Sequence, residues 1–419
     1  MRIAESTAKI LANIPLPDEV SVVHRQAAVV DIGSCTTRVG FAGDDTPRIA
    51  EPTCVVKGTG KDESLCLKKA HECRATADVS RVVVKGEVNW DAMEVLLNHL
   101  DELLELSTKD LQTPLLLTEK ILVPRAQRQK LAEILVERHA VTALHFVPSP
   151  VLALYAAGTC TGVSVEMGYD ACHVVPVFQG CPLFHAVHML NYGGDYLTRY
   201  MMATGPALPE VVQPAHRIDV WEHLKEKYCE ACPNSETFYE VRDSEASGSV
   251  SSLTDGHSNS YGPVQHQLPD GTVITLGSNR FVPVEMLLDP SLVTDDVFMF
   301  DQSAIENVER LRTSAEPRGL HSLIEESVKK CDLDLSPVFY ESIHFSGGCS
   351  LLRGLPQRVG SEIGEVAGNA PRIVAQTERR HAAFVGGSIL ASLPTFQDFW
   401  VTKAEYEEFG SSAVLRQCF

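Results

Sequence analysis

The sequence lacks basic residues relative to its acidic ones, and it lacks any hydrophobic run long enough to span a membrane. Lysine and arginine together number 36 against 55 aspartates and glutamates, which gives a formal net charge of −19. Because basic side chains supply most of the affinity for a phosphate backbone, we expect no direct nucleic-acid partner. A membrane-spanning helix needs about 20 successive apolar residues, so we also expect no membrane partner. Residues 1–26 include Glu5, Asp18 and Glu19, which is not typical of a signal peptide, and we therefore expect a cytoplasmic protein.

A paired set of cysteine motifs is also missing. The 12 cysteines are scattered, which is typical of reduced thiols in the cytoplasm and not of a disulfide framework. The one C-x-x-C motif, from Cys229 to Cys232, has neither a second such motif nor a histidine pair at the spacing of a zinc site. We interpret these cysteines as buried apolar residues.

The sequence does contain a turn that could hold a phosphate group. Residues 29–41 run from an apolar stretch into Asp31, through Gly33 and Ser34, and back into β-branched residues. This pattern predicts a β-hairpin with small residues at its tip. Backbone N–H groups at such a tip can approach phosphate closely, and a nearby carboxylate can order the water around Mg²⁺. An ordinary buried hairpin has the same pattern, so residues 29–41 alone leave both interpretations open.

The remaining pattern predicts a mainly parallel sheet covered by helices. A chain of 419 residues with 44% hydrophobic and 22% charged residues is large enough for two globular domains. Residues 91–106 and 125–138 are expected to form helices, and Leu115 to Leu117 lie between them as a short apolar strand. Strands that alternate with helices are typical of α/β proteins.

Several segments of the chain resemble the actin family, in the order in which that family has them. The most distinctive is GFAGDDTPR, from Gly40 to Arg48. The others are residues 89–91, 115–119, 268–275, 346–348, 386–393 and 418–419. On this resemblance, which extends from about Ala27 to Phe419, the chain is identified as a member of the actin family. The resemblance implies the actin-like ATPase fold, an α/β fold of two similar halves, or four subdomains, around a nucleotide cleft.

The resemblance also implies how the chain is divided. Residues 1–26 would be an N-terminal extension. Residues 27–156 would form the first half, with a small subdomain at about 53–81, and residues 382–419 would complete it. Residues 157–381 would form the second half, with a Ser/Gly/Asp-rich surface loop inserted at about 241–263 and a short helix at about 294–317. The loop at 57–63 is shorter than its counterpart in actins, which counts against self-polymerisation.

A site for ATP or ADP with Mg²⁺ follows from the same resemblance. Two carboxylates, Asp31 and Glu166, would order the water shell of Mg²⁺, and His173 and Ser149 would occupy the places that position the attacking water. The nucleotide itself would contact two hairpins, at 29–41 and 163–178, together with a helix, a glycine turn and a base-covering arginine. These nucleotide-binding residues would be Gly33, Ser34, Cys35, Arg38, Gly168, Lys225, Glu226, Gly347, Gly348 and Arg380.

Several positions depart from the actin pattern in ways that weaken hydrolysis. Cys35 replaces a glycine at the first tip, Tyr169 replaces an aspartate at the second, and Ser149 replaces the glutamine that orients water. Asp170 stands one residue late, and a shift of one residue along a strand would turn its side chain to the opposite face. Because positioning and electrostatics supply nearly all of the catalysis in phosphoryl transfer, we expect weak hydrolysis or none.

The preferred function is a divergent actin-related protein that acts as a structural subunit of a larger cytoskeletal or motor-associated complex, of a dynein, dynactin or axonemal type. Its partners would be other protein subunits, including actin or actin-related proteins. One alternative is a nucleotide-dependent actin-like filament protein with slow ATPase activity. Another is a subunit of a chromatin-remodelling complex, which would place the protein in the nucleus. A small-molecule kinase of the same superfamily is disfavoured by the actin-like C-terminus.

Overall fold

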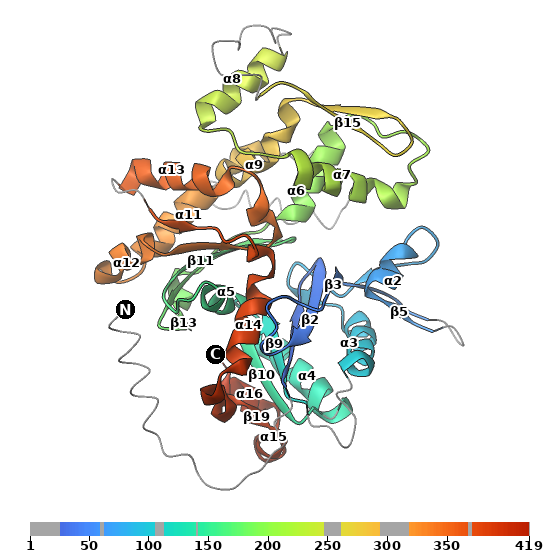
Figure 1. Ribbon diagram of the computed structural model, residues 1–419. Helices are drawn as coiled ribbons and strands as arrows, with labels where there is room; N and C mark the ends of the chain where they lie inside the picture. The colour runs from blue at the N-terminus through green and yellow to red at the C-terminus, as the bar shows by residue number, and fades with distance from the viewer. Residues whose placement is uncertain are drawn as a thin grey trace.

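The computed structural model describes residues 26–58, 63–104, 113–139, 141–246, 261–293, 318–367 and 371–418. Two six-stranded sheets form the centres of two lobes, one above the other in Figure 1. The strands of the lower lobe are β1 (Ala28–Ile32), β2 (Thr36–Phe41), β3 (Ile49–Pro52), β9 (Leu115–Glu119), β10 (Ala143–Pro148) and β19 (Val401–Thr402). The strands of the upper lobe are β11 (Gly162–Met167), β12 (Cys172–Phe178), β13 (Cys181–Pro182), β14 (His188–Leu190), β17 (Ile343–Ser346) and β18 (Ile373–Val374).

Both sheets are built in the same way. In each, one strand forms an antiparallel hairpin with the next, β1 with β2 and β11 with β12. The first strand of each hairpin also pairs in parallel with a later strand, β9 or β17, which pairs in parallel with β10 or β18 in turn. The central strands β1 and β11 are almost wholly buried, as expected for apolar strands with both faces covered. The prediction of two similar α/β halves is therefore confirmed.

Helices cover these sheets. Those of the lower lobe are α3 (Trp90–Leu104), α4 (Arg125–Glu133), α5 (Ser149–Ala156), α14 (Ala382–Ser392), α15 (Lys403–Phe409) and α16 (Ala413–Gln417). Those of the upper lobe are α6 (Gly194–Thr204), α7 (Pro214–Tyr228), α8 (Ser235–Ala246), α9 (Val282–Leu288), α11 (Leu320–Lys329), α12 (Ser336–Tyr340) and α13 (Leu355–Ala367).

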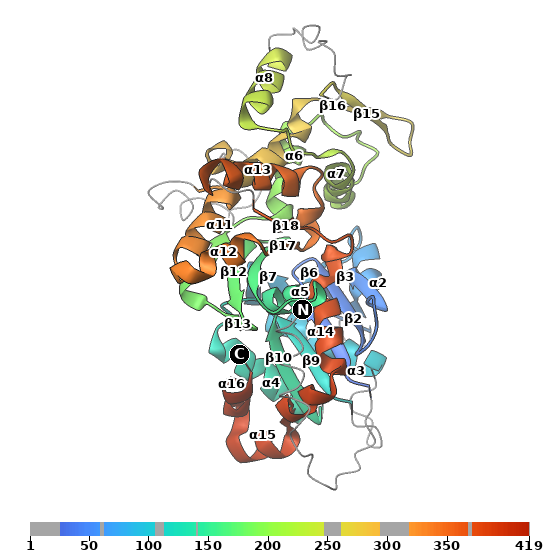
Figure 2. The ribbon, with the colours of Figure 1, turned by 60° about the vertical axis from the view of Figure 1, so that its left-hand side comes forward.

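Two of the helices, α5 and α14, lie at the centre of the molecule between the sheets (Figures 1 and 2). α14 packs on α5 and on strands β1 and β9, while α5 also contacts β11 of the upper lobe. The two helix backbones approach so closely that a Cβ atom added at Gly386 would overlap the carbonyl oxygen of Leu152. Glycine is therefore required at this crossing, through which the two lobes are joined.

Smaller sheets extend both lobes. In the lower lobe, β4 (Cys54–Val56) pairs with β5 (Leu65–Cys66) and β6 (Ser80–Arg81), beside α2 (Leu67–Glu72) and the hairpin of β7 (Val83–Val84) and β8 (Glu87–Val88). In the upper lobe, the hairpin of β15 (Val264–Gln267) and β16 (Val273–Leu276) projects outward (Figure 2). Just after α2, Arg74 forms an ion pair with Asp219 on α7, which ties the small sheet to the upper lobe.

The predicted elements are largely confirmed. The hairpins expected at 29–41 and 163–178 are β1–β2 and β11–β12, and the helix expected at 91–106 is α3. The helix expected at 125–138 is α-helical only to Glu133, and a π-helical turn continues it to Arg138. The loop expected at 241–263 is wrong at its start, because residues 241–246 continue α8 and bury Val241 in the core of the upper lobe. Residues 1–25 and the second insertion at 294–317 lie outside the described residues.

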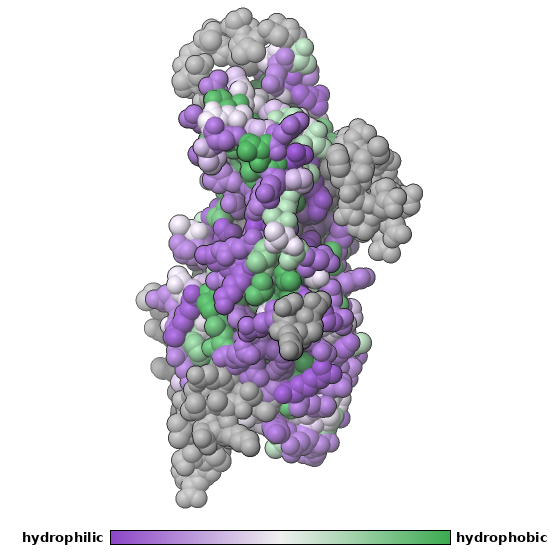
Figure 3. Space-filling view, turned by 90° about the vertical axis from the view of Figure 1, so that its right-hand side faces the viewer, coloured by the Kyte–Doolittle hydropathy of each residue, from purple (hydrophilic) through white to green (hydrophobic). Residues whose placement is uncertain are grey.

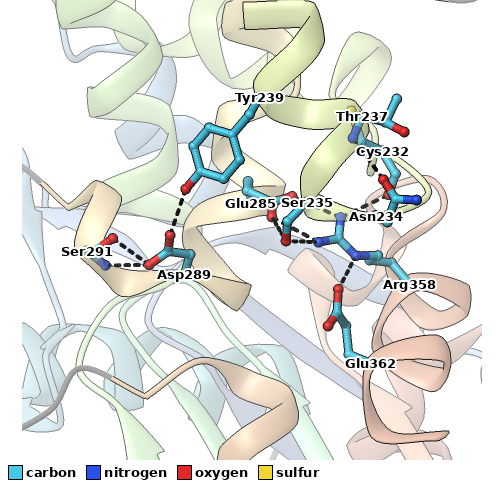
Figure 4. Close-up of polar contacts among 10 residues, drawn as sticks. All are labelled: Cys232, Asn234, Ser235, Thr237, Tyr239, Glu285, Asp289, Ser291, Arg358 and Glu362. Carbon is cyan, nitrogen blue, oxygen red and sulfur yellow. Dashed lines mark hydrogen bonds and ion pairs between the residues drawn. The ribbon is translucent and has the colours of Figure 1, made fainter. Parts of the chain in front are cut away.

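A buried ion-pair network joins three helices of the upper lobe (Figure 4). Arg358 on α13, whose side chain is 1% exposed, donates two hydrogen bonds of 2.9 Å to the carboxylate of Glu285 on α9. Its remaining N–H groups donate to Glu362 at 2.6 Å, to the Ser235 hydroxyl at 2.7 Å and to the Cys232 carbonyl at 3.0 Å. Since Ser235 begins α8, one guanidinium group holds α8, α9 and α13 together.

The surface on the side of the small sheet is mainly hydrophilic, with small and separate hydrophobic patches (Figure 3). Within the described ranges, none of the helices combines the length and the apolar character that a membrane crossing requires.

Candidate functional site

A pocket of about 240 Å³ lies between the lobes, where the tips of the two hairpins meet. Its other walls come from α6 and α7, from the turn at 346–348 that follows β17, and from the residues around the start of α14. The pocket is therefore built from elements that are far apart in the sequence and that occupy equivalent places in the two sheets.

The predicted site residues come together in this pocket with one exception. Those that line it are Asp31, Gly33, Ser34, Cys35, Arg38, Glu166, Gly168, His173, Lys225, Glu226, Gly347, Gly348 and Arg380. The exception is Ser149, which lies behind Glu166 at the start of α5. The sequence therefore located the pocket, while the role of each residue in it stays a prediction.

Asp31, at the end of β1, is engaged by protein donors on both carboxylate oxygens. Its Oδ2 accepts a hydrogen bond from Arg38 Nη1 at 2.8 Å, and its Oδ1 accepts one from the Thr118 hydroxyl at 2.5 Å. Arg38 also donates from Nε to His381 Nδ1 at 3.0 Å, which ties the first hairpin to the segment before α14. At the tip beside them, burial and the nearby Glu222 raise the pKa of the Cys35 thiol to about 11. Cys35 is therefore protonated at neutral pH and is not a nucleophile.

Glu166, at the end of β11, is engaged in the same way. The hydroxyl of Ser149 lies 3.0 and 2.8 Å from its two carboxylate oxygens and donates its one hydrogen to this carboxylate. This carboxylate borders the pocket but is surrounded by protein atoms, and the loss of hydration raises its pKa although the Ser149 hydrogen bond opposes the rise. Burial and the charge of Lys120 lower the pKa of His173 to about 4, so its imidazole is neutral at pH 7.

Asp170 faces the pocket, and the expectation that its side chain would point away is wrong. β11 ends at Met167, so Asp170 lies in the turn, where the alternation of a strand does not apply. Its carboxylate accepts hydrogen bonds from Arg81 Nη2 at 2.8 Å and from the backbone N–H of Lys85 at 2.7 Å. Burial favours a raised pKa for Asp170, but Arg81 outweighs burial and lowers it.

Two basic residues at the hairpin tips escaped the sequence analysis. Arg81, on β6 of the small sheet, donates to the Ser34 carbonyl at 3.2 Å as well as to Asp170, so it reaches both tips. Its guanidinium also lies over the Tyr169 ring, 4.9 Å from the ring centroid. Lys120 follows β9 directly, and its ammonium group donates to the Ser34 hydroxyl at 2.6 Å. Its place at the carboxyl end of a parallel strand was a signal that could have identified Lys120, whereas nothing local identifies Arg81.

Another wall of the pocket comes from α7 and from the glycine turn after β17. Lys225 on α7 is buried, and its ammonium group donates to the Gly194 carbonyl at 3.0 Å and to the Thr198 hydroxyl at 2.7 Å. Gly347 has a φ of +83°, and a Cβ atom there would overlap the Met167 carbonyl oxygen. Only glycine lets this turn lie so close to the second hairpin.

Two facing hairpins on equivalent sheets are the arrangement that the resemblance implied, and a comparison with protein families decides the question. The model of the family described as Actin matches residues 22–419. The chain belongs to the actin family. The predicted family and the actin-like α/β fold are therefore confirmed. Actin-family proteins generally bind a nucleotide with Mg²⁺, and they commonly bind other proteins.

In this actin-family chain, the residues present fit a Mg²⁺ ion poorly. Asp31 and Glu166 were expected to order its water shell, but Asp31 is paired with Arg38 and accepts from Thr118, and Glu166 accepts the hydroxyl hydrogen of Ser149. Mg²⁺ demands near-ideal octahedral geometry from oxygen ligands and water, so direct ligation by either carboxylate would require these contacts to break or rearrange. Nowhere in the described part of the chain are three or more His, Cys, Asp or Glu side chains grouped to hold a metal ion.

Proposed function

We propose that this chain is a divergent actin-related protein that binds ATP or ADP, hydrolyses it weakly or not at all, and serves as a structural subunit of a larger cytoskeletal or motor-associated complex. The observation that supports this most directly is the contact between Ser149 and Glu166. Ser149 occupies the place from which attacking water would be positioned. Its side chain is short, and its hydroxyl already donates to the Glu166 carboxylate.

A nucleotide that is bound but not cleaved can still act structurally. Because positioning and electrostatics carry phosphoryl transfer, an occupied Ser149 and a tyrosine at position 169 should lower the rate by orders of magnitude. Binding itself needs only contacts from both lobes, which the pocket lining supplies. A ligand present at 100 times its Kd and bound only by the folded state stabilises that state by about 2.7 kcal/mol. The nucleotide would therefore act as a clamp between the lobes.

The proposed partners are other protein subunits, including actin or actin-related proteins, in an assembly of a dynein, dynactin or axonemal type in the cytoplasm. Membership of the actin family supports protein partners in general. The net charge of −19 makes a direct nucleic-acid partner unfavourable. The filament protein and the subunit of a chromatin-remodelling complex stay as the two alternatives.

The test has three measurements on the purified full chain. Chromatography of a heat-released extract should find close to one adenine nucleotide per chain, and phosphate release from added ATP should stay near background. The protein should remain in the supernatant on centrifugation with ATP, and mass spectrometry of the material that copurifies from its native tissue should identify cytoskeletal subunits. A free monomer that splits ATP as fast as actin does would refute the proposal, and ATP-dependent pelleting would favour the filament alternative.

A further inference from the structure

We propose that the cations Lys120 and Arg81 hold the phosphates of the bound nucleotide and that no divalent metal ion is needed for binding. This inference rests on the proposed nucleotide site. Two observations lead to it. The carboxylates of Asp31 and Glu166 already accept hydrogen bonds from protein groups, and Lys120 and Arg81 lie at the hairpin tips.

Lys120 is a cation in the pocket without a carboxylate in direct contact among the described residues. Its ammonium group is held by the hydroxyl of Ser34 at 2.6 Å, at the tip of the first hairpin, and it lines the pocket. Across the residues that the structure describes, no carboxylate lies within ion-pair distance of it. Glu166 and Asp170 attract this ammonium group only from a greater distance. A neutral hydroxyl compensates an ammonium charge only weakly, so a phosphate group that arrives beside Ser34 would be its first charged partner in direct contact.

Arg81 supplies a second positive charge between the two tips. It reaches them from the small sheet, donating to the Ser34 carbonyl at 3.2 Å on one side and to Asp170 at 2.8 Å on the other. The ring of Tyr169 supports its guanidinium plane from one face. A planar guanidinium has five N–H donors in a fixed fork, and these two contacts leave donors that suit the oxygens of a phosphate group.

Basic side chains face the acidic ones at the hairpin tips. Three cations, Arg38, Arg81 and Lys120, face the carboxyl groups of Asp31, Glu166 and Asp170, and two of the cations are paired with two of the acids. A dication added here would find its carboxylates engaged and two positive side chains close by. A polyphosphate would instead gain contacts with Lys120 and Arg81 without any ion having to be admitted first.

The test is isothermal titration calorimetry of the nucleotide-free full chain with adenosine, AMP and ADP, each in 2 mM MgCl₂ and in 5 mM EDTA as chosen conditions. We expect the Kd for ADP to agree within about threefold in the two buffers. Binding of ADP that is at least tenfold weaker in EDTA overturns this inference and leaves the proposed function standing. Failure of ADP to bind in either buffer overturns both.

Variants separate the phosphate contacts from the rest of the site. Lys120→Met should weaken ADP at least tenfold in EDTA and leave adenosine unchanged, and Arg81→Gln should do the same. Lys57→Met is the matched control, because Lys57 is 67% exposed and pairs with Asp91 outside the pocket. If Arg81→Gln weakens adenosine as well, it has disturbed the pocket as a whole, and Lys120→Met decides. Wild-type affinity for ADP in Lys120→Met overturns the inference.

Discussion

Replacing Arg358 by methionine should destabilise the upper lobe by about 3–5 kcal/mol. Methionine fills much of the same volume, so the expected loss is mainly electrostatic. The Glu285 side chain is 2% exposed, and after the loss of the arginine it would retain the hydrogen bond from the Ser235 hydroxyl at 3.0 Å but no longer have its cationic partner. An uncompensated buried carboxylate is among the most destabilising single changes that a core can suffer.

Urea unfolding of the full chain, together with hydrogen exchange of the amides in α9, measures this loss. The double variant Arg358→Met with Glu285→Leu should recover most of the stability, because a well-packed apolar pair often replaces a buried ion pair without loss. Lys68→Met is the control, since Lys68 and Glu72 are 67% and 63% exposed and their pair should contribute less than about 1 kcal/mol. A loss below about 1 kcal/mol for Arg358→Met, or a double variant as unstable as the single one, would refute this reasoning.

Three further predictions concern the helix crossing, the histidines and the water-positioning place. Gly386→Ala should destabilise the chain by about 1–3 kcal/mol, because the added Cβ atom meets the Leu152 carbonyl. Gly360→Ala is the control: its Cβ atom would make only ordinary contacts with Ile373, so it should be neutral or stabilise the chain by up to about 1 kcal/mol. Thermal unfolding of the two variants measures the difference. Burial lowers the pKa of His145 and His344 to about 4, below the unfolded value near 6.5, so the unfolded state binds more protons between these pH values. Stability should therefore fall as the pH is lowered through that range, by up to about 1.4 kcal/mol per pH unit for each histidine, and an unfolding free energy that is equal at pH 7 and pH 5 would contradict this. Ser149→Gln should fail to restore ATP turnover, because Tyr169 and Cys35 remain at the tips. A large gain in phosphate release from this single change would show that the second hairpin does not limit hydrolysis.

Local pattern was enough to predict the first hairpin, whereas the second hairpin and the pocket between them were predicted from the resemblance to the actin family. Asp31 and Glu166 lie near the ends of equivalent apolar strands in the two sheets, and the resemblance to the actin family predicted that the two hairpins face one cleft. The ion pairs that define the site could not be predicted. Arg81 and Asp170 are 89 positions apart, and Lys120 and Ser34 are 86 apart. The first contact depends on how the two lobes meet and the second on the order of the strands in the lower sheet, and no local periodicity encodes either. Residues 241–246 were taken for a loop because their composition is polar, although Val241 is buried in the core.

The lower sheet is completed by segments from late in the chain, which affects how the protein folds during synthesis. Its edge strand β19 comes from residues 401–402 and pairs with β10, and α14, from residues 382–392, packs on β1 and β9. The apolar faces of β1, β9 and β10 therefore stay incompletely covered until residues 382–402 have left the ribosome, while the other sheet has all of its strands by residue 374. Since unfinished sheets with open edges tend to associate with one another, the protein should depend on chaperones for longer than its size alone suggests.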